Sequence, residues 1–118
     1  MNIIQKSLKL KHNDYYLQHL RIINAVLPVK LTNREIEVLA AFMSADSKLT
    51  EDDRFNSLVR KNIRDKLGLS PGGLSNYLNS MLKKGFLNKS KITNRITIKE
   101  FLFPDEPAQG YQFKIVKV

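Results

Sequence analysis

Apolar residues recur at intervals of three and four through the first two thirds of the chain, a spacing that predicts amphipathic helices. The first segment with this spacing covers residues 14–27 and stops at Pro28, which cannot continue a helix. The second begins with Thr32 and Glu35, which form the T-x-x-E pattern of a capping box. We therefore predict one helix over residues 14–27, with its first residue as N-cap, and another over about residues 32–45.

Two further helices are predicted within residues 55–85, on either side of a short turn. Apolar residues again keep helical spacing, and Gly68 stands where a left-handed residue commonly ends a helix. Ser70 and Pro71 are suited to the N-cap and the first position of the next helix. Gly85 is suited to end that second helix.

Alternation of apolar and polar residues, which predicts strands, occurs in three places. It occurs in residues 3–10, and again in residues 95–103 ("RITIKEFLF") and 111–118 ("YQFKIVKV"). The last two segments are predicted to form an antiparallel pair joined by residues 104–110, which contain two prolines. The polar stretch 46–54 is predicted to be a loop.

The order of these elements predicts one fold class. Two helices joined by a short turn and followed by a sheet are the plan of a helix-turn-helix with a β wing. We therefore predict an α+β fold, a single small winged helix-turn-helix domain over residues 1–118. A strand and helix extension occupies residues 1–30, a helical core with the helix-turn-helix at 55–85 occupies 31–85, and a β-hairpin wing occupies 86–118.

Length and composition limit the class of protein. With 118 residues, of which 42% are apolar and 26% charged, the chain has the composition of one globular domain. It contains no cysteine, which excludes disulfides and thiolate chemistry. It also lacks an apolar stretch of about 20 residues and the features of a signal peptide. A soluble intracellular protein is expected.

Positive charge is concentrated in one part of the chain. The formal net charge is +9. Residues 70–99 carry six Lys or Arg and no Asp or Glu, whereas residues 31–69 carry seven residues of each sign. This distribution favours a polyanionic partner, and its position on the second helix and the wing favours double-stranded DNA.

The predicted helix over residues 70–84 has an outward face suited to the major groove of DNA. Asparagine can pair bidentately with adenine, and serine and lysine can reach base edges or phosphates. Two glycines in the first turn lower helix propensity by about 1 kcal/mol each, which is understandable if side chains there would obstruct a close partner. The residues predicted to contact DNA on and beside this helix are Ser70, Gly72, Gly73, Ser75, Asn76, Asn79, Ser80, Lys83 and Lys84. Those predicted to follow phosphates along the wing are Lys89, Lys91 and Arg95.

Three short motifs mark the helical core. The letters L-T open the second predicted helix, G-L-S forms the turn, and K-G-F follows the last helix. In these features residues 31–99 resemble the winged helix-turn-helix of MarR-type bacterial and phage DNA-binding regulators. The opening "LTNREIEVL" also resembles LuxR-type domains, which lack a sheet after the recognition helix. The resemblance implies a small transcriptional regulator in the cytoplasm of a bacterial or phage-infected cell. The sequence departs from the family in two ways: the segment 46–54 is longer, and there is no long C-terminal dimerisation helix.

A second class of function stays open at this level. A winged helix can serve as a protein-binding module, and an exposed polar helix face is ordinary for a protein surface. The alternative is therefore a structural or protein-interaction subunit of a large assembly such as a phage particle, which places it in the virion. Residues 1–28 are then the expected surface for a homodimer or assembly partner.

An enzyme is not expected. The two histidines, His12 and His19, are seven positions apart, and the sequence contains neither an H-x-x-x-H pair nor a glycine-rich phosphate loop. No nucleophile, base and orienting group can be assembled from the pattern. We therefore expect no catalytic residue, no metal site and no cofactor.

Overall fold

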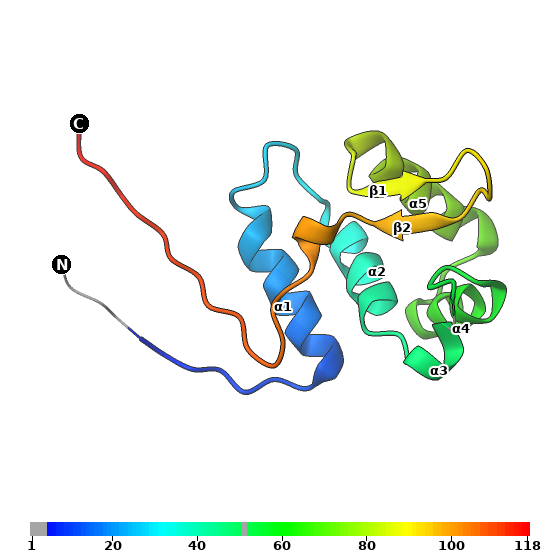
Figure 1. Cartoon of the computed structure of the whole chain (residues 1–118), viewed down its shortest axis with the longest axis horizontal. Helices are drawn as coiled ribbons and strands as arrows, with labels where there is room; N and C mark the ends of the chain where they lie inside the picture. The colour runs from blue at the N-terminus through cyan, green and yellow to red at the C-terminus, as the bar shows by residue number, and fades with distance from the viewer. Residues whose placement is uncertain (1–4, 51) are drawn as a thin grey trace.

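The computed structural model describes residues 5–50 and 52–118. The helices pack together, and a β-hairpin lies over the last α-helix (Figure 1). The described residues form an α+β arrangement with a two-stranded antiparallel sheet, as the sequence predicts at that level. In chain order the elements are α1 (His12–Asn24), α2 (Asn33–Met43), α3 (Ser47–Thr50), α4 (Ser57–Leu67), α5 (Pro71–Lys84), β1 (Leu87–Lys89), β2 (Ile96–Ile98) and the 3-10 helix η1 (Glu100–Leu102).

Helix α2 lies at the centre of the core. Helices α1, α4 and α5 all pack against it and cover the continuous buried run from Val38 to Met43. Phe42 is fully buried and stacks on Phe55, with ring centroids 4.3 Å apart. The buried residues of α2 are Glu35, Ile36, Val38, Leu39, Ala40, Ala41, Phe42 and Met43.

Both ends of α2 are satisfied by side chains. The Thr32 hydroxyl accepts a hydrogen bond from the Glu35 amide (3.1 Å), and Glu35 Oε1 accepts one from the Thr32 amide (2.8 Å). This confirms the predicted capping box. At the other end, Arg54 Nη1 donates to the carbonyl oxygens of Phe42 and Met43, both at 2.9 Å. The segment that connects α2 to α4 is therefore bound to the C-terminal end of α2.

Helix α1 is displaced from its predicted position. It begins after Lys11, so the prediction that Asp14 is the N-cap is wrong. Asp14 lies in the first turn instead, where its carboxylate interacts favourably with the helix dipole. The helix ends at Asn24, whose side chain bonds to Leu31, donating to its carbonyl (3.1 Å) and accepting from its amide (2.8 Å).

The connection between α2 and α4 was predicted as a plain loop, but it contains the one-turn helix α3. Asp46 starts this turn, because its Oδ1 accepts from the Lys48 amide (2.9 Å) and its carbonyl accepts from the Thr50 amide (3.0 Å). Helix α4 then begins at Ser57, two residues later than predicted. Asn56 is its N-cap and accepts from the Val59 amide at 2.9 Å.

The predicted N-terminal strand is not formed over residues 5–10, and residues 3 and 4 of that prediction lie outside the described residues. Residues 5–10 are exposed, including Leu8 and Leu10. No other strand of the described chain lies beside them (Figure 1). Alternation of side chains makes a segment suitable for a sheet, but a strand also needs a neighbour that accepts and donates its backbone hydrogen bonds.

The hairpin pairs different segments from those predicted. Strand β1 pairs with β2 in the register Leu87↔Ile98 to Lys89↔Ile96, whereas residues 111–118 form no strand. The pairing of residues 95–103 with 111–118 is therefore wrong. The segment that follows Gly85 at the end of α5 already lies beside β2, so this segment pairs with β2 in place of residues 111–118. The tripeptide in β1 has no alternating pattern of its own from which to predict a strand.

Candidate nucleic-acid interface

The turn between α4 and α5 is built by local signals that the sequence contains. Gly68 ends α4 in the left-handed conformation with φ of +66°. The Ser70 hydroxyl accepts from the Gly73 amide at 2.9 Å, and Pro71 is the first residue of α5. The predicted C-cap, N-cap and first position are thus confirmed. These caps fix the direction in which α5 leaves the turn.

Helix α5 has one buried face and one face in water. Leu74, Leu78 and Met81 are buried against the core. The opposite face brings together most of the residues predicted to contact DNA, while Gly73 and Ser80 are half-buried. Those left exposed on or beside the helix are Ser70, Gly72, Ser75, Asn76, Asn79 and Lys83.

The two glycines in the first turn of α5 differ in their surroundings. A Cβ atom at Gly73 would lie 3.1 Å from the capping Ser70 Oγ, a tight contact within the fold itself. A Cβ atom at Gly72 would meet nothing within 4 Å. Packing within the described protein therefore gives no reason for glycine at position 72.

Lys84 points into the protein rather than away from it. Its Nζ lies 2.5 Å from Glu35 Oε1 and 3.0 Å from the Lys30 carbonyl oxygen. The Glu35 side chain is only 2% exposed and that of Lys84 is 23% exposed. Lys84 therefore joins the end of α5 to the start of α2, and its charge is balanced within the fold.

The buried carboxyl of Glu35 is held in its ionised form. Burial raises its pKa, but hydrogen bonding from Lys84 and from the Thr32 amide, together with the nearby Ser80 hydroxyl, lowers the pKa below its usual value. Ser80, predicted to contact DNA, is half-buried.

The hairpin carries the other predicted contacts, at the end of the molecule away from α1 (Figure 1). Lys89, Lys91 and Arg95 are all exposed. Within the described ranges, neither their side chains nor that of Lys83 has an ion-pair or hydrogen-bond partner. These four cations are free to meet an external anion.

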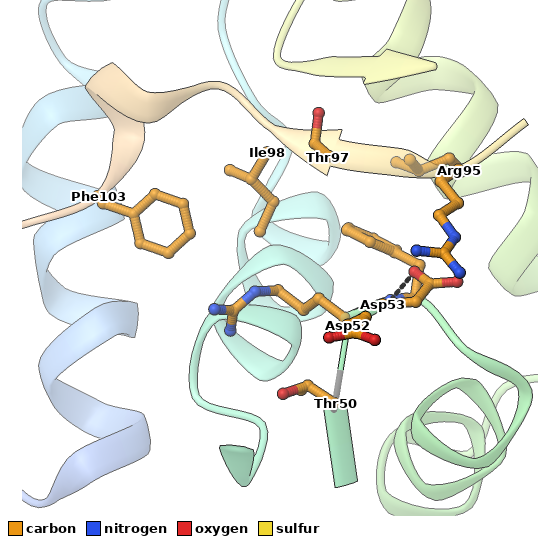
Figure 2. Close-up of a pocket in the computed structure, with 10 residues that line it drawn as sticks. Thr50, Asp52, Asp53, Arg95, Thr97, Ile98 and Phe103 are labelled. Atoms are coloured by element: carbon orange, nitrogen blue, oxygen red, sulfur yellow. Dashed lines mark hydrogen bonds between the residues drawn. The ribbon is translucent and has the colours of Figure 1, made fainter. Parts of the chain in front are cut away.

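A shallow pocket of about 300 Å³ lies between β2 and the connection that precedes α4 (Figure 2). Arg95, the residue before β2, extends along the pocket rim toward Asp53, and Phe103 and Ile98 line the other side. Arg54 crosses the pocket with its guanidinium carbon 5.4 Å from the Phe103 ring centroid. The guanidinium of Arg54 holds the connection onto α2, because its Nη1 donates to the carbonyl oxygens of Phe42 and Met43. No pattern in the sequence predicts this pocket.

Helix α1 holds the segment that follows the hairpin. The hydroxyl groups of Tyr15 and Tyr16 donate to the Asp105 carbonyl and to Glu106 Oε1. His19 is 5% exposed, with Nε2 2.8 Å from the Leu102 carbonyl oxygen and Nδ1 hydrogen-bonded to the Tyr111 hydroxyl. Sequence reasoning considered His19 only as a metal ligand and missed this packing role, which no local spacing encodes.

Burial lowers the pKa of His19, although its hydrogen bond with the Leu102 backbone acts in the opposite direction. The neutral ring is the form that fits the site. Its Nε2–H donates to the carbonyl oxygen, and its Nδ1 then accepts from the tyrosine hydroxyl. His19 therefore contributes to the fold as an uncharged residue.

Comparison of this chain with protein-family models, with curated proteins and with solved structures finds no match. In the part of the chain that the structure describes, no helix is long and apolar enough to cross a membrane. The same part contains no group of three or more His, Cys, Asp or Glu residues placed to hold a metal ion.

Proposed function

We propose that this protein binds double-stranded DNA as a small winged helix-turn-helix regulator of bacterial or phage type, with α5 as the recognition helix and β1–β2 as the wing. The observation that carries the proposal is the exposed surface of residues 70–99. It presents amides, hydroxyls and four unpaired cations and contains no carboxylate. Such a surface matches base edges flanked by phosphates.

The assignment of roles follows the exposure of each residue. Asn76 and Asn79 lie on the exposed face of α5, where an amide side chain can pair with an adenine edge. Lys83, Lys89 and Lys91 supply phosphate contacts, joined by Arg95 at the pocket rim. Lys84 is left out of the interface because Glu35 already binds it.

Binding of the purified protein to duplex DNA at several salt concentrations tests this proposal. Four phosphate contacts predict a slope of log K against log salt concentration of roughly −3 to −4. After selection of a preferred duplex from a random pool, Asn76→Ala or Asn79→Ala is expected to cost about 1–3 kcal/mol of binding free energy. Asn62→Ala, an exposed asparagine on α4, is the matched control. Absence of binding at low salt contradicts the proposal.

Gly72→Ala separates a functional reason for this glycine from a structural one. Because the added methyl group meets nothing in the fold, we expect the free energy of unfolding to rise by up to about 1 kcal/mol. We expect DNA affinity to fall about tenfold, since the methyl group obstructs approach of the phosphate backbone to the first turn of α5. Thermal unfolding and DNA titration measure the two effects. A more stable variant with unchanged affinity contradicts the placement of this turn against DNA.

A second candidate function, a subunit of a larger assembly, is favoured by the exposed apolar side chains of the two terminal segments. Phe113 and Ile115 are 60% and 97% exposed, and Leu8 is 62% exposed. Both segments leave the helical body on the same side (Figure 1). Such exposed apolar residues are suited to a protein partner. A mass in solution well above one chain that does not change with salt, together with no DNA binding, favours this candidate.

A further inference from the structure

The most exposed apolar side chain of the hairpin is at its tip. Ile92 is 94% exposed and lies in the loop of residues 90–95 between β1 and β2. The loop lies at the right-hand end of the molecule, away from α1 (Figure 1). An isoleucine at this place contributes nothing to the core, and its exposure costs free energy that a partner can recover.

The loop that presents Ile92 is held by its own hydrogen bonds. The Ser90 amide donates to the Arg95 carbonyl and the Asn94 amide to the Ser90 carbonyl, both at 2.9 Å. Ser90 Oγ also accepts from the amides of Ile92 and Thr93, both at 3.2 Å. Asn94 has a φ of 60°, a conformation that asparagine tolerates better than most residues. The tip is thus formed before any partner arrives.

The surroundings of Ile92 are basic. Lys91 precedes it, Lys89 ends β1, and Arg95 closes the loop, while residues 70–99 contain no acidic residue. A partner for this tip must therefore carry negative charge at its surface and present apolar groups just beneath that surface. Duplex DNA has that profile, since its phosphates flank grooves whose floor is the edge of the base stack.

We propose that Ile92 inserts between two base pairs from the minor groove and bends the DNA, while the neighbouring lysines contact phosphates. This inference rests on the proposed function and deepens it. Apolar side chains used in this way partly unstack a base step and kink the duplex. The wedge acts best at pyrimidine–purine steps such as TA, which unstack most easily.

A protein partner fits the tip less well. Protein interfaces bury about 800 Å² on each side and have an apolar centre. Here Lys91, Thr93 and Asn94 surround a single isoleucine, so no apolar patch of that size is formed around it. One narrow apolar group between cations suits insertion into a groove better than docking on a flat surface.

The test measures affinity and bending on one DNA. A duplex of about 30 base pairs with a central TA step carries a fluorophore at each end, so that bending shortens the distance between them. Ile92→Ala is expected to bind about tenfold more weakly and to bend the duplex less. Its salt dependence should equal that of the wild-type protein because no charge is removed. Lys91→Ala should instead reduce the salt slope by about one.

Ile115→Ala is the matched control, because Ile115 is equally exposed at 97% but lies in the C-terminal segment. It is expected to bind and bend DNA as the wild-type protein does. If the wild-type protein binds with a steep salt slope and Ile92→Ala bends DNA equally well, the wedge is overturned and the proposed function stands. If the wild-type protein does not bind DNA, both are overturned. Binding to anionic phospholipid vesicles that depends on Ile92, without bending of DNA, also overturns the wedge.

Discussion

Replacement of Lys84 by alanine is expected to lower the free energy of unfolding by about 2–4 kcal/mol at neutral pH. The neighbouring change Lys83→Ala is expected to alter it by less than about 0.5 kcal/mol. Lys84 lies against the buried Glu35 carboxylate, so its loss leaves a buried charge without its counter-ion. Lys83 is exposed and has no such partner. Two adjacent lysines, both candidates from sequence for phosphate contact, are thereby assigned different roles.

Chemical denaturation and DNA titration of the two variants check this assignment. Lys83→Ala should reduce the salt slope of DNA binding by about one, whereas Lys84→Ala should not. Adding Glu35→Gln to Lys84→Ala should recover part of the lost stability, because the unpaired charge is removed. Equal stability of the two single variants would contradict the inward role of Lys84.

The same ion pair sets a pH dependence of known sign. Because the pKa of Glu35 is lowered in the folded state, its contribution to stability is present above the ordinary carboxyl pKa. This contribution is lost as the pH falls through the lowered value. In the Lys84→Ala variant, burial raises the pKa of Glu35 with less opposition. The loss of stability at low pH that comes from Glu35 should therefore diminish.

The second large effect is expected at His19. His19→Ala should lower the free energy of unfolding by about 2–4 kcal/mol, since it leaves a cavity and an unpaired Leu102 carbonyl. The wild-type protein should also lose stability as the pH falls below about 6.5, the ordinary histidine value. The sign follows from the lowered pKa, because the unfolded chain binds the proton more tightly than the folded protein.

Unfolding measured from pH 8 to pH 5 tests this expectation, with His19→Gln as the informative variant. Glutamine can still donate to the Leu102 carbonyl but does not titrate, so the loss of stability between about pH 6.5 and pH 5 should shrink. His12→Gln, which removes the exposed histidine of the same helix, is measured alongside for comparison. If His19→Gln keeps the wild-type profile, the loss of stability comes from other groups.

Local chemistry in the sequence was sufficient for the caps of the central helices. The Thr32–Glu35 box, Gly68, the Ser70–Pro71 start and Gly85 all lie within one turn of the backbone groups that they satisfy. Their effect therefore does not depend on the rest of the fold. Helical spacing of Leu74, Leu78 and Met81 likewise identified the buried face of α5, and hence its exposed face.

Contacts between distant residues were decided only by the tertiary structure. Strand pairing depends on which segment lies beside β2. The alternation of residues 111–118 does not reveal that His19 of α1 binds the Tyr111 hydroxyl instead. Lys84 looks like Lys83 in the sequence, because the Glu35 that distinguishes them is 49 positions away. The sequence by itself determined the longer helices α1, α2, α4 and α5 to within a few residues, the caps formed by the Thr32–Glu35 box, Gly68, Ser70 and Gly85, and the acid-free stretch 70–99. The tertiary structure decided the pairing of the strands and which cations stay free, since both depend on neighbours that chain order does not reveal.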